Sequence, residues 1–384
     1  MERRRERAPW RDDLPARPDV LVLGAGIAGA AVARAAAQRG ATVAWADLRR
    51  AGEGATGRNA GFILADGADP YARVAEAQGR DVADALRAAG LATREAVREL
   101  ARHHDIGWVP SGSLRLAMDA DEAADLEATA DALGLTWLAA DRLPAPWRGG
   151  PWLGGLVDDG DGAVDPLDLL DAVVAEARRA GAALLEGASA ARPEREGSRW
   201  RVRVGDRVIE PAIVVVAASH ASSALAPAGA VALPLTAWRA QMLAARVKPT
   251  PRAPRPVYAR GGHDYLRVLS TGTVLLGGQR DEGGDEERTT EETPGPAVQR
   301  ALERLLARWF PHAQRRKVIA RWAGTMAFTP DGLPLAGAWP GADGLYVLAG
   351  LMGHGMGWGL GLGAAVAEAA LGGAPAPAVF APAR

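Results

Sequence analysis

Residues 19–66 read DVLVLGAGIAGAAVARAAAQRGATVAWADLRRAGEGATGRNAGFILAD, and this stretch decides the fold. Its first residues, 19–23, are mostly apolar and predict a buried strand. Alanine and valine then recur at helical spacing over residues 27–38, and Gly40 closes that predicted helix. Residues 41–46 predict a second strand. The order of strand, helix and strand is typical of a βαβ unit.

Glycines between the first strand and the helix form a G-x-G-x-x-G motif, in which Gly24 allows a tight turn, Gly26 lets the backbone approach a pyrophosphate, and Gly29 lets helix and strand pack closely. The helix N-terminus offers N–H groups and the positive end of its dipole to phosphates. Asp47 ends the second strand, where a carboxylate can accept hydrogen bonds from an adenosine ribose. We therefore predict a dinucleotide site rather than a glycine-rich turn without a ligand. The predicted contacts are Gly24, Gly26, Ile27, Ala28, Gly29, Asp47 and Leu48.

The composition narrows the classes of function. A chain of 384 residues is long enough for two domains and a large core. Its 45 basic and 46 acidic residues nearly balance, so the charge favours no nucleic-acid partner. The absence of cysteine excludes disulfides, thiolate metal sites, iron–sulfur clusters and a flavin tethered through cysteine. A cytoplasmic location is the simple interpretation.

Two groups of candidate metal ligands do not predict a metal site. Asp158, Asp159 and Asp161 alternate with glycine, but the remaining ligands of an EF-hand loop and its closing Glu are absent, so a turn is expected. His103 and His104 are neighbours on a predicted helix and would face different ways. We therefore predict no bound metal.

A second glycine-rich loop, GATGRNAGF, follows at residues 54–62. A nicotinamide dehydrogenase would usually continue directly into its next helix. Here glycines let the backbone approach a flat ligand, and Arg58 and Asn59 add polar contacts. The predicted contacts are Gly57, Arg58, Asn59, Ala60 and Gly61.

The C-terminal region carries another glycine-rich pattern, GLYVLAGLMGHGMGWG, at residues 344–359. Its low charge resembles that of a membrane span, but its many glycines and its strand-like start favour a strand, a turn and a helix instead. We expect no membrane span. The N-terminus of the predicted helix, at residues 353–357, offers a positive dipole end to a ligand.

These motifs resemble those of the D-amino-acid oxidase, glycine oxidase and sarcosine oxidase (DAO) superfamily of FAD-dependent oxidoreductases. The resemblance is carried by GATGRNAGF, by TPDGLPLAG at residues 329–337 and by the GHGMG that follows, although Asp47 replaces the usual Glu of the family. It implies non-covalent FAD, with the C-terminal glycines against the isoalloxazine ring. The further flavin contacts that it implies are Ala190, Ala218, Gly324, Gly353, His354, Gly355, Met356 and Gly357.

The resemblance also implies an α/β fold: a Rossmann-like FAD-binding domain and a second, mostly antiparallel β-sheet (α+β) substrate domain. Residues 1–17 are expected to form a flexible tail, and residues 281–296 an exposed acidic loop. The FAD-binding domain is expected to comprise residues 18–72, 162–230 and 323–384, and the substrate domain residues 73–161 and 231–322.

Two departures from the family pattern concern the substrate. Met326 stands where glycine and D-amino-acid oxidases carry an Arg that binds the substrate carboxylate, so a simple amino acid is disfavoured unless Arg260, Arg267 or Arg280 takes over. Sarcosine-oxidase-type members use a lysine near the flavin to promote its reaction with oxygen, but residues 249–316 contain none. The candidate substrate-pocket residues are Tyr265, Arg267, Met326 and His354.

We therefore expect oxidation of the C–N bond of a primary or secondary amine, or of an N-substituted amino acid, to an imine by hydride transfer to flavin N5. Oxygen or an electron carrier would be the acceptor, and the sequence predicts no oligomeric state. Three alternatives remain: a D-amino acid or glycine-type oxidase or dehydrogenase, a nicotinamide dehydrogenase, and a flavin-binding subunit of a larger dehydrogenase.

Overall fold

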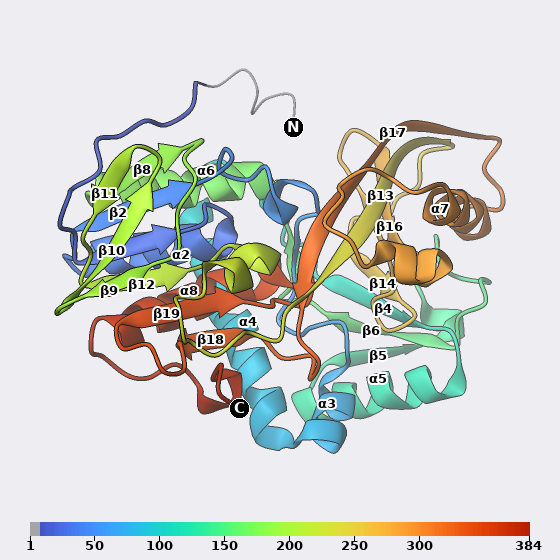
Figure 1. The fold of residues 1–384 in the computed structure, drawn as a ribbon. Helices are drawn as coiled ribbons and strands as arrows, with labels where there is room; N and C mark the ends of the chain where they lie inside the picture. Colours follow the sequence, from blue (N-terminus) through green and yellow to red (C-terminus); the bar gives the residue numbers. More distant parts are fainter. Residues whose placement is uncertain (1–7) are drawn as a thin grey trace.

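The computed structural model describes residues 8–384, which form two adjoining parts, each built on a large β-sheet (Figure 1). The first sheet has six strands, all parallel except β18, which runs antiparallel to β19. Its central strand, VLVL, is buried throughout, as expected of a strand covered on both faces. In spatial order the strands are β18 (Leu335–Ala338), β19 (Leu345–Ala349), β12 (Ile213–Val216), β1 (Val20–Leu23), β2 (Val43–Asp47) and β8 (Ala183–Glu186).

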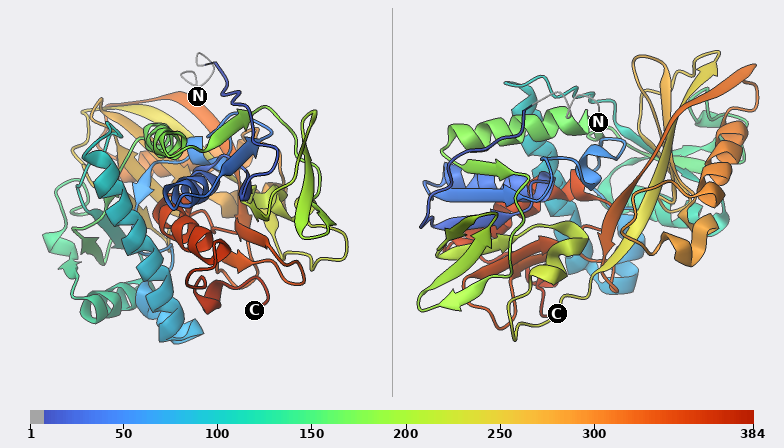
Figure 2. Two further views of the ribbon diagram at one scale, coloured as in Figure 1. Left: turned by 90° about the vertical axis from the view of Figure 1, so that its left-hand side faces the viewer. Right: turned by 45° about the horizontal axis from the view of Figure 1, so that its top comes forward.

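Helices α2 (Ile27–Gln38), α6 (Pro166–Arg179) and α8 (Gly355–Ala370) share one hydrophobic core with one face of this sheet (Figure 2). The predicted helix over residues 27–38 is confirmed. The other face is covered by a small sheet of β9 (Glu194–Glu196), β10 (Arg199–Val204) and β11 (Arg207–Ile209), whose Trp200 is buried. This arrangement and the antiparallel second sheet confirm the predicted fold class.

The crossing of α2 over β1 leaves no space for side chains. A Cβ on Gly29 would lie 1.9 Å from the carbonyl oxygen of Gly24. A Cβ on Gly24, whose φ is +117°, would lie 2.3 Å from the carbonyl oxygen of Ala217, just beyond β12. The close packing of helix and strand predicted from the glycine motif is therefore present.

The second sheet has eight strands, antiparallel except where β4 pairs with β14. Helix α7 (Pro296–Trp309) shares its core, in which Trp309 meets Trp147 and Trp152 edge to face. Helix α5 (Ala120–Leu133) packs beside its other end and is capped by Asp119, which accepts the N–H of Glu122. In spatial order the strands are β17 (Arg315–Phe328), β13 (Thr236–Lys248), β16 (Thr273–Gly278), β15 (Asp264–Val268), β14 (Val257–Ala259), β4 (Ser113–Ala117), β6 (Gly154–Asp158) and β5 (Thr136–Ala139).

Helix α4 (Arg80–Ala101), which follows α3 (Tyr71–Gln78), lies beside α8 and joins the core of the six-stranded sheet (Figure 2). The segment predicted for the substrate domain, residues 73–161, includes α4, so part of that segment packs on the core of the six-stranded sheet. Glycines allow it: a Cβ on Gly90 would lie 1.9 Å from the oxygen of Ala65, and one on Gly361 would lie 2.4 Å from the oxygen of Ala89.

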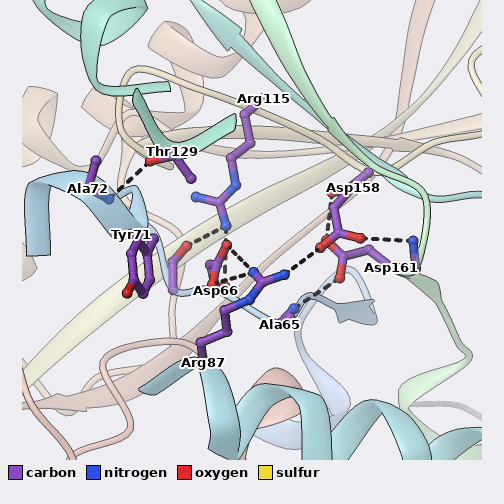
Figure 3. A network of polar contacts seen from close by, with 12 residues as sticks. Ala65, Asp66, Tyr71, Ala72, Arg87, Arg115, Thr129, Asp158 and Asp161 are labelled. Atoms are coloured by element: carbon purple, nitrogen blue, oxygen red, sulfur yellow. Dashed lines mark hydrogen bonds and ion pairs between the residues drawn. The ribbon is translucent and has the colours of Figure 1, made fainter. Parts of the chain in front are cut away.

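A network of buried charges fixes α4 to the eight-stranded sheet (Figure 3). Arg87 donates to both carboxylate oxygens of Asp66 at 2.9 Å, and Arg94 contacts Asp158 and Asp161 at 3.2 Å. Burial, and then the neighbouring charge of Asp158, raise the pKa of Asp161 to about 6. The turn predicted around these aspartates is therefore a structural anchor. Within residues 8–384, no group of three or more His, Asp or Glu side chains is arranged so that it could hold a metal ion.

The predicted flexible tail is ordered along part of its length. Residues 1–7 lie outside the described residues. Beyond them, the N–H of Asp12 bonds to the oxygen of Leu184, and its carboxylate pairs with Arg178 at 2.7 Å. This segment therefore lies along the edge strand β8 and shields its unpaired backbone. Across the described chain, no helix has the length and apolar character needed to cross a membrane.

The segment predicted to be an exposed acidic loop is partly buried, which corrects that expectation. It begins with a 3-10 turn, η4 (Arg280–Glu287), and the Glu287 side chain is 1% exposed. Arg239 of β13 donates to both Glu287 oxygens, at 2.9 and 2.8 Å, and Gln241 adds a third donor. A run of acidic residues is typical of a solvated loop, and no local pattern shows that one member pairs with a distant buried arginine.

This pair gives a stability prediction. Glu287→Gln removes the counterion of Arg239 and leaves a buried cation, so the free energy of unfolding should fall by about 3–5 kcal/mol. Urea unfolding of the purified protein measures the loss. In the control Glu282→Gln, the altered pair with Arg304 is solvent-exposed, so the change should stay within about 1 kcal/mol. Equal losses of unfolding free energy in the two variants would contradict the role of Glu287 as the buried counterion of Arg239.

Candidate active site

A cavity of about 710 Å³ lies between the two large sheets and is lined by residues from both. It extends from the start of α2, past the loops that follow β2 and β12, to the start of α8. Its far wall is formed by β13, β14, β15 and β17. The N-termini of two helices therefore meet one continuous space, which suits a long ligand with negative charge.

The first end of the cavity is the glycine turn predicted from the sequence. Gly24, Gly26, Ile27 and Ala28 line it, with Leu48, whereas Gly29 is used in packing. Asp47 also lines the cavity, where its carboxylate accepts the N–H of Ala25 at 2.5 Å and that of Arg49 at 2.7 Å. Burial raises the pKa of Asp47, and the two N–H groups oppose that shift. Asp47 thus stabilises the turn and faces the ligand space.

The second glycine-rich loop forms the next part of the wall and ends in β3 (Phe62–Ile63), which pairs with β7 (Gly162–Ala163). Arg58, Asn59 and Ala60 line the cavity, but Gly57 and Gly61 do not. These two glycines shape the loop, because a Cβ on either would lie within 2.3 Å of a backbone oxygen. The Asn59 amide also folds the loop, since it bonds to three of its backbone groups.

Glu292, in the segment between η4 and α7, binds two arginines that follow β2, a contact the sequence did not predict. Its carboxylate lies 2.9 Å from both Arg49 and Arg58, and it lines the cavity. Arg58 also donates to the backbone carbonyl oxygens of Glu53 and Ala323, at 3.0 and 2.7 Å. The acidic segment therefore closes the cavity along its middle.

The other end of the cavity is the turn from β19 into α8. Gly353, Gly355, Met356 and Gly357 line it together with His354, which is the N-cap of the helix. The Nε2 atom of His354 accepts the N–H of Ala68 at 2.9 Å, so the ring proton of the neutral side chain lies on Nδ1. Burial, with the nearby charge of Arg115, lowers the pKa of His354 to about 3. His354 is therefore neutral at physiological pH.

Aromatic side chains of the eight-stranded sheet face this end. Tyr258 and Tyr265 meet edge to face with ring centroids 6.1 Å apart, and Phe62 packs against both. Burial raises the pKa of Tyr258 to about 12 and raises that of Tyr265 as well. Met326 lines the same region, where its sulfur would lie 3.0 Å from a Cβ on Gly353. Tyr265, Met326 and His354 are thus brought together.

Arg267 is not part of this group, which corrects its prediction as a pocket residue. Its guanidinium is buried and donates to the backbone oxygens of Ala60 and Val164. It therefore supports the glycine-rich loop from behind and does not line the cavity. Of the other predicted contacts, Ala190, Ala218 and Gly324 all line it. Arg280, which the sequence named as a possible carboxylate partner, also lines the cavity. Lining residues that the sequence did not predict for the site include Gln241, Thr290, Glu292 and His220.

Comparison with known families explains this geometry. The family described as FAD dependent oxidoreductase (DAO) matches residues 19–369. The chain belongs to the DAO family. Its members are FAD-dependent oxidoreductases, and the residues present here fit FAD: a glycine turn at a helix N-terminus, an acid at the end of β2, and a second helix N-terminus at the far end of one cavity.

Individual relatives agree with this assignment. The glycine oxidase of Geobacillus kaustophilus is 27% identical over 87% of this chain and 88% of that protein. The tRNA 5-methylaminomethyl-2-thiouridine biosynthesis bifunctional protein MnmC of Burkholderia mallei is 30% identical over 84% of this chain, which spans about half (48%) of that relative. Two crystal structures share the fold. The Geobacillus glycine oxidase superposes with a TM-score of 0.81 and 24% identity, over 96% of this chain and 98% of that one. An L-proline dehydrogenase from P. horikoshii superposes with a TM-score of 0.80 and 20% identity, over 98% of each chain.

The bridge from Glu292 to two arginines predicts an effect on cofactor retention. Glu292→Gln weakens the closure across the cavity, so FAD should dissociate more readily, with a dissociation constant raised roughly fivefold, equivalent to about 1 kcal/mol. Fluorescence of released FAD during dilution measures this. Glu291→Gln, at the exposed neighbouring position, is the matched control. Tighter FAD binding by Glu292→Gln would mean that the carboxylate repels the cofactor instead.

The low pKa of His354 predicts a pH effect on stability. Because the folded protein resists protonation of this ring, the unfolded chain binds the additional proton between about pH 3 and 6.5. Stability should fall with decreasing pH over that range, by up to about 1.4 kcal/mol per pH unit from this group. His354→Gln retains an acceptor for Ala68 and should reduce that slope in urea unfolding at several pH values. Parallel curves for the two proteins would refute a neutral, buried His354.

Proposed function

We propose that this protein oxidises the C–N bond of a primary or secondary amine, or of an N-substituted amino acid, to an imine that water then hydrolyses. FAD, held without a covalent bond, supplies the hydride acceptor at its N5 atom. A D-amino acid or glycine-type reaction is the second candidate, and the name of the glycine oxidase relative supports it. A role as the flavin-binding subunit of a larger dehydrogenase is a further alternative.

The observation that carries the proposal is that the titratable rings at the aromatic end of the cavity, Tyr258, Tyr265 and His354, are all neutral. Tyr258 and Tyr265 stay protonated at physiological pH because their pKa values are raised, and His354 stays neutral because its pKa is lowered. Hydride transfer from an amine needs a neutral nitrogen in a dry, positioned pocket and no strong side-chain base. The absence of a catalytic acid–base pair among these residues fits that reaction.

The remaining residues have supporting roles in this proposal. Phe62 and the two tyrosines exclude water from the reacting end. The N-terminus of α8, at Gly355, would offer the positive end of its helix dipole to negative charge on a bound flavin. Met326 contributes an apolar surface and no charge.

A different observation supports one kind of electron acceptor. Residues 249–316 contain no lysine, which supports a dehydrogenase that transfers electrons to a carrier over an oxidase that uses oxygen. A cytoplasmic location and the boundaries of the substrate domain stay predictions.

A spectrum and an anaerobic titration test the proposal. The purified protein should be yellow and release FAD on denaturation, and an amine substrate should bleach the flavin band without oxygen. Slow recolouring in air would favour a dehydrogenase, and fast recolouring an oxidase. A protein that releases FAD but is bleached by no primary amine, secondary amine or amino acid would overturn the proposed reaction.

A further inference from the structure

Arg280 is a cation at the cavity wall that contacts no acidic side chain of the described residues. It lies two residues beyond the end of β16 and lines the cavity. Its guanidinium lies over two aromatic rings, 5.2 Å from the centroid of Trp238 and 4.7 Å from that of Phe328. Stacking uses the faces of the planar group, so its N–H edges remain available for hydrogen bonds. Within residues 8–384, these N–H groups form no hydrogen bond and no ion pair.

Other arginines that could hold a substrate anion are already engaged. Arg260 pairs with Asp281 at 2.8 Å and with Asp264 at 3.5 Å. Arg267 donates to backbone oxygens behind the loop. Asp281, the acid next to Arg280, is therefore bound by Arg260, and Arg280 keeps its charge for a ligand.

The surroundings of Arg280 favour an anion in the cavity. Burial lowers the pKa of its guanidinium, and the neighbouring Tyr265 interacts with it electrostatically. A partly buried guanidinium stays charged, so its lost hydration must be replaced by a partner. A carboxylate suits its planar fork, because two parallel N–H···O bonds can form.

We propose that Arg280, which lines the cavity together with Tyr265, binds a carboxylate of the substrate. The inference rests on the proposed amine oxidation and narrows its substrate to an amine that carries a carboxylate, such as an N-substituted amino acid. The anion site would then lie at the end of β16, whereas Met326 on β17 leaves the position expected from the family apolar. Arg280 thus orients the substrate and takes no part in proton transfer.

The first test measures binding and needs no turnover. Benzoate and its neutral analogue benzamide are titrated into the FAD-loaded protein, and the shift of the flavin absorbance bands is recorded. Benzoate should bind saturably and benzamide at least tenfold more weakly. Arg280→Met should weaken benzoate binding roughly 100-fold or more, and Arg280→Lys should do so less, because it keeps the charge and loses the fork. Equal binding of benzoate and benzamide by the unaltered protein would overturn the inference without any variant.

Arg288→Met is the matched control. Arg288 stacks on the same Trp238, with 4.9 Å to the ring centroid, but it pairs with Asp285 and does not line the cavity. Its replacement should leave benzoate binding unchanged, and the FAD content of each variant identifies a loss that comes from misfolding. Equal weakening in Arg288→Met and Arg280→Met would refute a specific anion site.

A second test separates this inference from the proposed reaction. Anaerobic bleaching is compared for sarcosine and dimethylamine, and for phenylglycine and benzylamine, pairs that differ in a carboxylate. Faster bleaching by the acids, lost in Arg280→Met, supports the inference. Equal bleaching within each pair sustains amine oxidation and overturns the carboxylate site. Benzoate binding that depends on Arg280, with no bleaching by any amine, sustains the anion site and overturns amine oxidation.

Discussion

The structure depends on one steric constraint: only hydrogen fits where α2 crosses β1 and the chain that leaves β12. The oxygens of Gly24 and Ala217 occupy the positions that side chains on Gly29 and Gly24 would need. Because the backbones approach this closely, the positive end of α2 reaches the carboxyl edge of the parallel sheet. The turn, the acid at Asp47 and the loops after β2 and β12 then converge on one space. The cavity, and with it the FAD site of the family, follows from that crossing.

Charges are arranged around the same space in a consistent way. The reacting end holds neutral groups, whereas the acidic side chains of η4 and the segment after it, Glu287 and Glu292, are satisfied by arginines from other elements. Arg280 is the contrast, since its guanidinium meets aromatic faces and the cavity. Uncompensated buried charge is expensive, so a site that keeps such a cation facing its cavity is organised around an anion.

Much of this could be predicted from the sequence, because the decisive signals are local. The glycine motif, the helix over residues 27–38 and the glycine-rich turn before α8 each combine residues that are close in the chain. Tyr265 and Arg267 share one face of β15 by strand alternation, yet only Tyr265 reaches the cavity. Arg267 lies farther along the strand, where two buried carbonyl oxygens take its donors, and no periodicity reveals that. The same holds for Glu287 and Glu292, whose partners are distant in sequence, and for α4, whose amphipathic pattern does not say which sheet it covers.

The contacts of α4 with the segment after β3 and with α8 have a consequence for how this sequence can diverge. A Cβ on Gly26 would lie 3.1 Å from the side chain of Thr56. A smaller residue at position 56 could therefore make room for a side chain at position 26. At Gly90 and Gly361 the obstacle is a carbonyl oxygen, which every residue possesses. No second substitution can therefore rescue a first one at these two positions. We expect homologues to replace these two glycines only where the whole helix has moved. Their presence therefore indicates how the helices are arranged and not which reaction is catalysed.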